Sequence, residues 1–134
     1  MWWLIVIPKL ASAQLTISIV NISESKGKVL IALYHSKADF LIESKVNHFA
    51  KVDVSTKKIS YSFKDLPQGY YAISLFHDIN NNEKLDTNFF GIPIEPYGFS
   101  NNAKARFGPP SYDEASFYYN GQSLSLAIKL KKAL

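Results

Sequence analysis

A chain of 134 residues has room for one domain, and a domain of this length buries about two-thirds of its unfolded surface, so folding requires neither disulfides nor metal. It has no cysteine, which excludes thiol redox catalysis, disulfide bonds and thiolate metal sites. Its net charge of +4 is scattered, whereas a nucleic-acid-binding protein concentrates positive charge, so we expect no nucleic-acid partner. Lys129, Lys131 and Lys132 are interpreted as solvated strand-end charges, with contact to an anionic surface as the alternative.

The N-terminal residues have the features of an export signal. Residues 2–7 are apolar, and Ala11-Ser12-Ala13 has the small-x-small form that signal peptidase accepts. The apolar run is short and no basic residue precedes it, so we expect the true start upstream; a frayed N-terminal strand is the alternative. No other stretch approaches the roughly 20 apolar residues that span a membrane. The sequence therefore predicts a signal peptide over 1–13 and one domain over 14–134 that is periplasmic, cell-surface or secreted, with no transmembrane segment.

The remainder of the chain is rich in residues that favour strands. It has eight Tyr and nine Phe, and a helical turn fits only between Ser36 and Phe49. Turn residues at 25–28, 55–58 and 120–121 predict hairpins between successive strands. The pattern predicts an all-β fold, an antiparallel immunoglobulin-like sandwich of about seven strands. The predicted strands are 15–20, 29–34, 50–54, 59–63, 70–77, 115–119 and 124–130.

A long stretch between His77 and Ala115 has no strand periodicity. Loops of this length inside compact domains are usually functional or disordered. This one carries too much aromatic surface for a disordered linker. We therefore expect an ordered loop packed over one end of the sandwich and organised by an ion. Its aromatic residues are Phe89, Phe90, Tyr97, Phe99 and Phe107.

Within that stretch, oxygen-bearing side chains recur with the spacing of a cation-binding loop. Asp78, Asn80, Asn82 and Asp86 fall at relative positions 1, 3, 5 and 9, and alternate residues of a tight loop can point several oxygens inward. With the Lys84 carbonyl as a further ligand, they predict a structural calcium site. The alternative is a polar loop in which Asp and Asn cap their own backbone.

Several blocks of the chain resemble one bacterial family. They include Leu66-Pro67-Gln68-Gly69-Tyr70-Tyr71-Ala72, the acidic loop, and Gly98-Phe99-Ser100-Asn101-Asn102-Ala103. The chain resembles the exported family of uncharacterised proteins known as domain of unknown function 2141 (DUF2141). The resemblance covers nearly all of the mature chain and implies an exported single-domain protein, with no activity to carry over. The Leu-Pro-x-Gly-x-Tyr turn is also similar to those of transthyretin-like sandwiches.

The acidic loop departs from the family pattern, Asp-x-Asn-Gly-Asn-Gly-x-x-Asp. Asn81 and Glu83 stand where the pattern has glycines, and Glu83 is at the sixth position, where a cation loop turns sharply and favours Gly. Phe89 stands at the twelfth position, so the bidentate Glu of an EF-hand is absent. Calcium would take its remaining ligands from water or from Glu95, Asp113 or Glu114.

Other residues suggest competing functions. His35 and His77 both end predicted strands, and a transition metal shared between them requires those ends to meet. The exposed-looking aromatics, Tyr70 and Tyr118 among them, are either cross-strand packing or a platform for sugars or peptide. The function predicted is a non-enzymatic exported module whose calcium-stabilised loop presents a surface to a protein partner or glycan. The alternative is a small extracytoplasmic hydrolase or lyase that uses loop carboxylates and His77.

Overall fold

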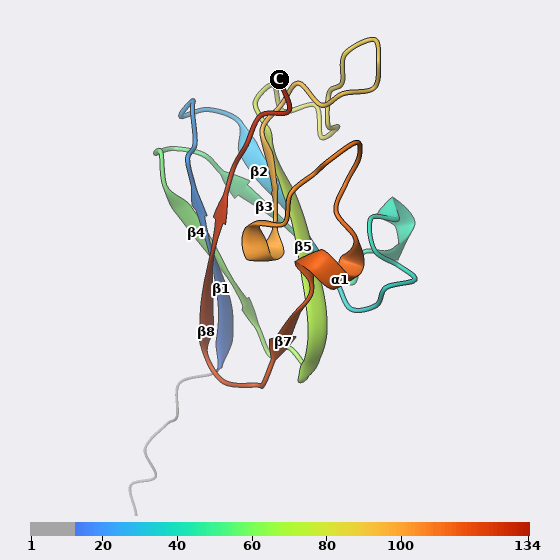
Figure 1. Ribbon diagram of the computed structural model, residues 1–134. Helices are drawn as coiled ribbons and strands as arrows, with labels where there is room; N and C mark the ends of the chain where they lie inside the picture. The colour runs from blue at the N-terminus through green and yellow to red at the C-terminus, as the bar shows by residue number, and fades with distance from the viewer. Residues whose placement is uncertain (1–12) are drawn as a thin grey trace, which may run out of the picture.

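The computed structural model describes residues 13–134, which form two β-sheets packed face to face (Figure 1). The three-stranded sheet has the order β4 (Ile59–Lys64), β1 (Gln14–Val20), β8 (Leu124–Lys129). The five-stranded sheet has the order β3 (His48–Asp53), β2 (Lys28–Tyr34), β5 (Gly69–Asp78), β6 (Tyr97–Phe99), and β7 (Phe117–Tyr119) also pairs with β5. The predicted all-β sandwich is confirmed.

The sheets differ from the prediction in strand count and direction. The described residues form eight strands, because the short β6 lies within the stretch expected to be a loop. Strand β8 runs parallel to β1, with Ile17 opposite Leu126, so the expectation of a wholly antiparallel sandwich is wrong. The finer comparison with immunoglobulin-like or transthyretin-like sandwiches stays a prediction.

The core lies between the two sheets and follows the alternation in the sequence. Leu15, Ile17 and Ile19 of β1 are fully buried, and the residues between them are only half-buried. They face inward-pointing residues of β2 and β5, including Ile31 and Ile73, which are also fully buried. Strand β2 is apolar on both faces because one face packs in the core between the sheets and the other is covered from outside, where Phe40 packs against the buried Tyr34.

All three predicted hairpins are wrong, because the turns connect strands of different sheets. The turn at 25–28 joins β1 to β2, the turn at 55–58 joins β3 to β4, and Asn120-Gly121 lies between β7 and β8. Gly and Asn permit the chain to reverse, but the same residues serve a reversal within one sheet or a crossing between two packed sheets. The turn residues therefore predicted where the chain reverses but not which strands pair with each other.

Short helical segments complete the fold. The 3₁₀ segment η1 (Glu43–Lys45) lies in the region predicted to hold a helical turn, and η2 (Ser100–Asn102) follows β6. The single turn α1 (Tyr112–Ala115) was missed, although its capping box is visible in the sequence: the Ser111 side chain accepts from Glu114 N and the Glu114 carboxylate accepts from Ser111 N.

The predicted signal peptide lies outside the described residues, apart from its last residue, Ala13. Among residues 13–134, no helix is long and apolar enough to cross a membrane.

Candidate functional site

The acidic loop begins where β5 ends, at one end of the five-stranded sheet (yellow in Figure 1). Asp78, the last residue of β5, is fully buried and lies opposite Lys28 of β2. Gly27 has φ +71° and packs so closely that a Cβ there would lie 2.3 Å from the Asp78 main-chain oxygen. The turn before β2 therefore requires glycine at this position to accommodate the start of the loop.

The buried Asp78 carboxylate organises the loop backbone. One oxygen, Oδ1, accepts from Asn82 N at 3.2 Å, and Oδ2 accepts from Glu83 N at 2.7 Å. A buried carboxylate requires such partners, because leaving it without hydrogen bonds would cost several kcal/mol, of the order of 5. Through these hydrogen bonds Asp78 closes a tight turn between residues 78 and 83.

The other predicted ligands gather around Asp86. Asn80 Nδ2 donates to Asp86 Oδ2 at 2.7 Å, and Asn82 Nδ2 donates to Asp86 Oδ1 at 2.8 Å. These two hydrogen bonds, that from Asn82 first, hold the pKa of Asp86 below its ordinary value of 3.8. Asn80 Oδ1 and Asp78 Oδ1 share a common donor, Asn82 N. The four predicted side chains therefore converge, as the sequence spacing predicted.

The loop turns at both positions where the family pattern has glycine. Asn81 has φ +58° and Glu83 has φ +61°, in the left-handed region that is costly for a residue with a side chain. The predicted strain at Glu83 is confirmed. Its carboxylate forms ion pairs with Lys51 and, at 3.4 Å, with Lys28. The hydrogen bond from Lys51, followed by the charges of Lys28 and Lys51, lowers the pKa of Glu83 from 4.5.

Of the three extra ligands considered, only Glu95 lies at the loop. It is 5% exposed, and its two oxygens accept from Ile79 N at 2.8 Å and Asp86 N at 3.0 Å. It therefore joins the two ends of the loop through their backbone. Asp113 pairs instead with Lys37, and Glu114 caps α1, which lies well away from the loop in Figure 1. The suggestion of these two as ligands is wrong.

The oxygen set of the loop is two carboxylates and two amides. Within residues 13–134, no three His, Asp or Glu side chains are grouped as a metal cluster. The Lys84 backbone lies beside the set, because Lys84 N donates to Asn82 Oδ1 at 3.0 Å. Calcium accepts carboxylate, amide and main-chain oxygens together with water, so the chemistry of this set fits a weak calcium site. It does not fit zinc, which selects His and Cys.

The two strand-end histidines lie far apart. His77 pairs with Val29, and His35 follows Tyr34, at the other end of the same antiparallel ladder. Six residues of strand separate them, about 20 Å. The hypothesis of a shared metal is therefore wrong, because the carboxyl ends of antiparallel neighbours point in opposite directions.

His77 is fully buried beside the loop. Its Nε2 lies 2.7 Å from the Lys26 main-chain oxygen, and its Nδ1 has no hydrogen-bond partner. His35, in contrast, is exposed and stacks on Tyr71 with ring centroids 4.8 Å apart. His77 therefore anchors the turn before β2 at the start of the acidic loop.

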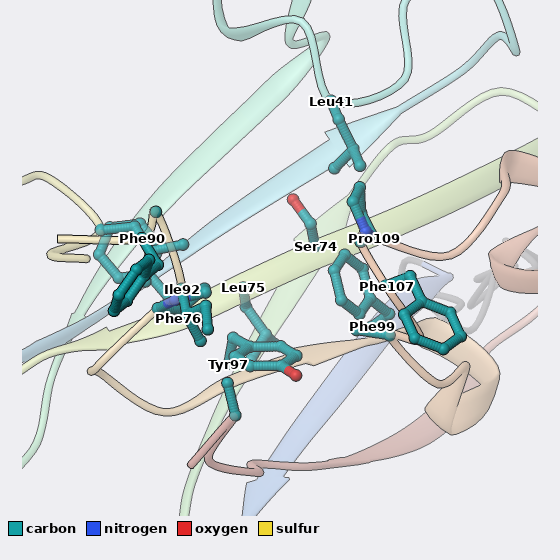
Figure 2. A pocket seen from close by; sticks show the side chains of 16 residues that line it. Leu41, Ser74, Leu75, Phe76, Phe90, Ile92, Tyr97, Phe99, Phe107 and Pro109 are labelled. Carbon is teal, nitrogen blue, oxygen red and sulfur yellow. The ribbon is translucent and has the colours of Figure 1, made fainter. Parts of the chain in front are cut away.

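A groove of about 620 Å³ lies beside the loop, over one edge of the five-stranded sheet. In Figure 2, Phe90 and Ile92 of the loop lie at one end, Phe107 and Pro109 lie at the other, and Tyr97 lies between them. Phe90 is 82% exposed and Phe107 is fully exposed. Phe89 is 97% exposed as well, whereas Phe99 is buried and Tyr97 is half-buried and packs against it. The long stretch therefore packs on the sheet through Tyr97 and Phe99, and Phe89, Phe90 and Phe107 face solvent.

The remaining aromatics divide between core and surface. Tyr119 is buried in the core, whereas Tyr70 and Tyr118 are exposed and lie with ring centroids 5.1 Å apart on neighbouring strands. Cross-strand packing thus accounts for these three residues.

The Ser100-Asn101-Asn102 segment has a structural role that sequence reasoning did not identify. Ser100 is fully buried, accepts from Ile73 N at 2.9 Å and donates to the main-chain oxygen of Ala115. Asn101 Nδ2 donates to the Ser116 main-chain oxygen at 2.7 Å, and Asn102 Oδ1 accepts from Lys129 N at 2.9 Å. No local pattern predicts these contacts, because their partners are 15 to 27 residues away.

Comparison with known proteins gives one match. A family described as "uncharacterized protein conserved in bacteria" (DUF2141) matches residues 17–126, from β1 through the first half of β8. No curated protein and no solved structure matches the chain. The matched range includes the acidic loop, the groove-lining segments 85–93 and 105–109, and the Ser-Asn-Asn segment. The match covers most of the chain, from the sandwich core to the acidic loop. The chain therefore belongs to the DUF2141 family.

Proposed function

We propose that this protein is a non-enzymatic, exported binding module whose acidic loop is stabilised by calcium and presents a surface to a protein partner or glycan. The observation that carries the proposal is the convergence of Asp78, Asn80, Asn82 and Asp86 in one hydrogen-bonded cluster. Export rests on the sequence of residues 1–13, which has the features of a signal peptide.

Calcium would act on the charge of this cluster. The Asp86 carboxylate accepts hydrogen bonds from the neutral amides of Asn80 and Asn82, which leave its negative charge in place, and the charge of Lys84 also acts on it. Rotating the two amides by half a turn would bring their oxygens toward the Asp86 carboxylate, in exchange for the hydrogen bonds that these oxygens now accept from Asn82 N and Lys84 N. Asp78 is buried and accepts from Asn82 N and Glu83 N, so it would reach the ion through the lone pairs that those bonds leave free. The Lys84 carbonyl and water would complete the shell, and Glu95 would hold the two ends of the loop together.

A calcium ion bound here would be structural. Ordering a loop has a conformational cost, and a ligand that binds only the folded loop offsets it. Leu85 of the loop and Phe90 and Ile92 just after it line the groove, so the order of the loop bears on this surface of aromatic and aliphatic side chains. The ion therefore supports the binding surface rather than reacting with a substrate.

The proposal is tested by thermal unfolding of the full chain in EDTA and then across a calcium titration, with magnesium as the control ion. At about ten times a dissociation constant in the millimolar range, linkage gives about 1.4 kcal/mol, a rise in melting temperature of a few degrees. Asp86→Asn keeps the shape of the side chain but removes its charge, and we expect it to abolish the rise.

The matched control is Asp113→Asn, which removes a carboxylate that is exposed and paired with Lys37 outside the loop. We expect this variant to respond to calcium like the unmodified protein. An equal response of Asp86→Asn and Asp113→Asn, or an equal response to magnesium, would show that the acidic loop is not a calcium site.

The geometry does not favour the alternative of a hydrolase or lyase. A general base must reach within hydrogen-bond distance of its substrate. His77 is fully buried and its Nε2 is engaged by the Lys26 main-chain oxygen. Both oxygens of the neighbouring Asp78 accept backbone hydrogen bonds, so neither residue is presented to a substrate.

A further inference from the structure

The groove beside the acidic loop has a lining without charge. Of its sixteen lining residues only Ser74 and Tyr97 carry a polar side chain, and none carries a charged one. Its volume of about 620 Å³ lies within the roughly 300–1,000 Å³ that is typical of small-molecule sites. Such a lining favours a hydrocarbon occupant over a sugar, because a sugar would have to give up water for few hydrogen-bonding partners.

Two aromatic side chains at the ends of the groove remain exposed to water. Phe90 and Phe107 both line the groove and are among the most exposed large apolar residues between positions 13 and 134. Phe107 also has φ +41°, an outlier for a bulky residue. Strained, exposed side chains of this kind occur where a ligand or partner is bound.

The rim of the groove is positive. Lys84, Lys104, Arg106 and Lys132 each adjoin a lining residue in the sequence and are exposed. None of the four forms an ion pair within the described part of the chain. Lys84 stands close to two acids, Glu83 and Asp86, and its charge acts on the Asp86 carboxylate. The positive charge without an acid nearby in the sequence is that of Lys104, Arg106 and Lys132. An apolar groove with an unneutralised cationic rim complements a molecule with a hydrocarbon tail and an anionic head.

We propose that the groove binds a free single-chain anionic amphiphile, such as a fatty acid, with its acyl chain along the apolar floor. Its head group lies at the end formed by residues 104–107, where Lys104 and Arg106 stand on either side of the lining residue Ala105. The acyl chain covers Phe90 and Phe107, which are otherwise in water. This inference goes beyond the proposed function, because it assigns an anionic amphiphile, rather than a protein partner or glycan, to the groove that the acidic loop borders.

The experiment measures direct binding of octanoate, decanoate and laurate to the full chain by isothermal titration calorimetry, below their micellar concentrations. We expect saturable binding that tightens roughly tenfold for every two methylenes, as burial of a hydrocarbon chain requires. The uncharged alcohol of the same length should bind more weakly, and the matching alkyltrimethylammonium should bind least. Binding that is independent of chain length, or equal for the anion and the cation, overturns the proposal.

Two pairs of variants locate the site. Phe107→Ala removes an exposed groove aromatic, and Tyr118→Ala removes an exposed aromatic on β7 that does not line the groove. Arg106→Glu reverses a rim charge, and Lys58→Glu reverses an exposed charge on the turn between β3 and β4. We expect the first of each pair to weaken laurate binding at least fivefold and the second to leave it unchanged.

Two further outcomes separate this inference from its alternatives. Binding to anionic phospholipid vesicles without any binding of monomeric laurate would overturn the fatty-acid site in favour of a membrane-surface contact. Laurate binding and calcium stabilisation are measured separately. A protein that calcium stabilises but that binds no amphiphile refutes this inference and leaves the calcium site standing. A protein that binds laurate but does not respond to calcium refutes only the calcium site.

Discussion

At the scale of single residues, the acidic loop combines tight turns with side chains that do not favour them. Asn81 tolerates its positive φ better than most residues do, whereas Glu83 is strained by its positive φ. Glu83 has two compensating interactions, the ion pairs with Lys28 and Lys51. These pairs are solvent-exposed, and screening by water leaves them little stabilising effect. The backbone at this position is therefore held chiefly by Asp78, which accepts the Glu83 N–H.

A pair of substitutions separates the strain from the ion pairs. Glu83→Ala removes the ion pairs and keeps a Cβ in the left-handed conformation, whereas Glu83→Gly removes both. We expect the Gly variant to be more stable than the Ala variant by about 1 kcal/mol, measured by urea unfolding.

The control is Lys58, which is exposed and does not have a positive φ. There Gly should be the less stable of the two, because it loses more backbone entropy on folding. If the Gly and Ala variants have the same order of stability at both positions, Glu83 does not adopt the left-handed conformation in solution.

At the scale of elements, the Ser100-Asn101-Asn102 segment joins parts of the fold that are remote in sequence. Ser100 connects β5 to the end of α1, and Asn102 connects to β8 of the other sheet. Since β6 has only three residues, these side-chain hydrogen bonds supplement its short ladder with β5. The segment therefore stabilises the wall of the groove rather than forming a site of its own.

Removing the buried hydroxyl tests this role. Ser100→Ala leaves the Ile73 N–H without its partner in a fully buried environment, and we expect a loss of about 1–3 kcal/mol in the free energy of unfolding. Chemical denaturation measures the loss. Ser125→Ala on the exposed face of β8 serves as the control and should change stability by less than about 0.5 kcal/mol. If Ser100→Ala is as stable as Ser125→Ala, the Ser100 hydroxyl does not stabilise the connection between β5 and the end of α1.

At the scale of the whole molecule, stability should fall at acid pH through the acidic loop. The pKa of Asp86 is held below 3.8 by Asn82 and Asn80, and that of Glu83 below 4.5 by Lys51 and Lys28. A carboxyl group with a lowered pKa in the folded state stabilises the fold fully above its unfolded pKa and loses that contribution as the pH falls through its folded pKa. The loss should therefore begin below about pH 4.5 and continue below 3.8.

The double variant Glu83→Gln/Asp86→Asn isolates this contribution. Above pH 5 it should be less stable than the unmodified protein, and the difference should disappear as the pH falls below these values, as followed by urea unfolding at each pH. Added salt should reduce the Glu83 part, which depends on exposed lysines, more than the Asp86 part, which depends on neutral amides. A difference that stays constant down to pH 2.5 would contradict the assigned pKa directions.

Much of the fold and part of the site could be predicted from local pattern. The alternation at Leu15, Ile17 and Ile19 predicted a strand with one buried face, because side chains of a strand point alternately to its two faces. The spacing of Asp78, Asn80, Asn82 and Asp86 likewise predicted their convergence, because all four lie within one tight loop. Both predictions depend on contacts between residues that are close in sequence.

Local pattern failed where the partner is distant. The turn at Ser55-Thr56-Lys57-Lys58 predicted a reversal, but burial of both inner faces decided that β3 and β4 belong to different sheets. Of the acids suggested from elsewhere in the chain, Glu95 does lie at the loop, but Asp113 pairs with Lys37 instead, and no local pattern distinguishes the two.

The sequence by itself determined seven of the eight described strands, the positions of the reversals and the oxygen cluster of the acidic loop, since short-range geometry governs each of them. Only the tertiary structure decided the strand pairing, the separation of His35 from His77 and the groove between residues 85–93 and 105–109. These features depend on which surfaces the two sheets bury against each other, and that choice is made by the free energy of the whole core rather than by any one segment.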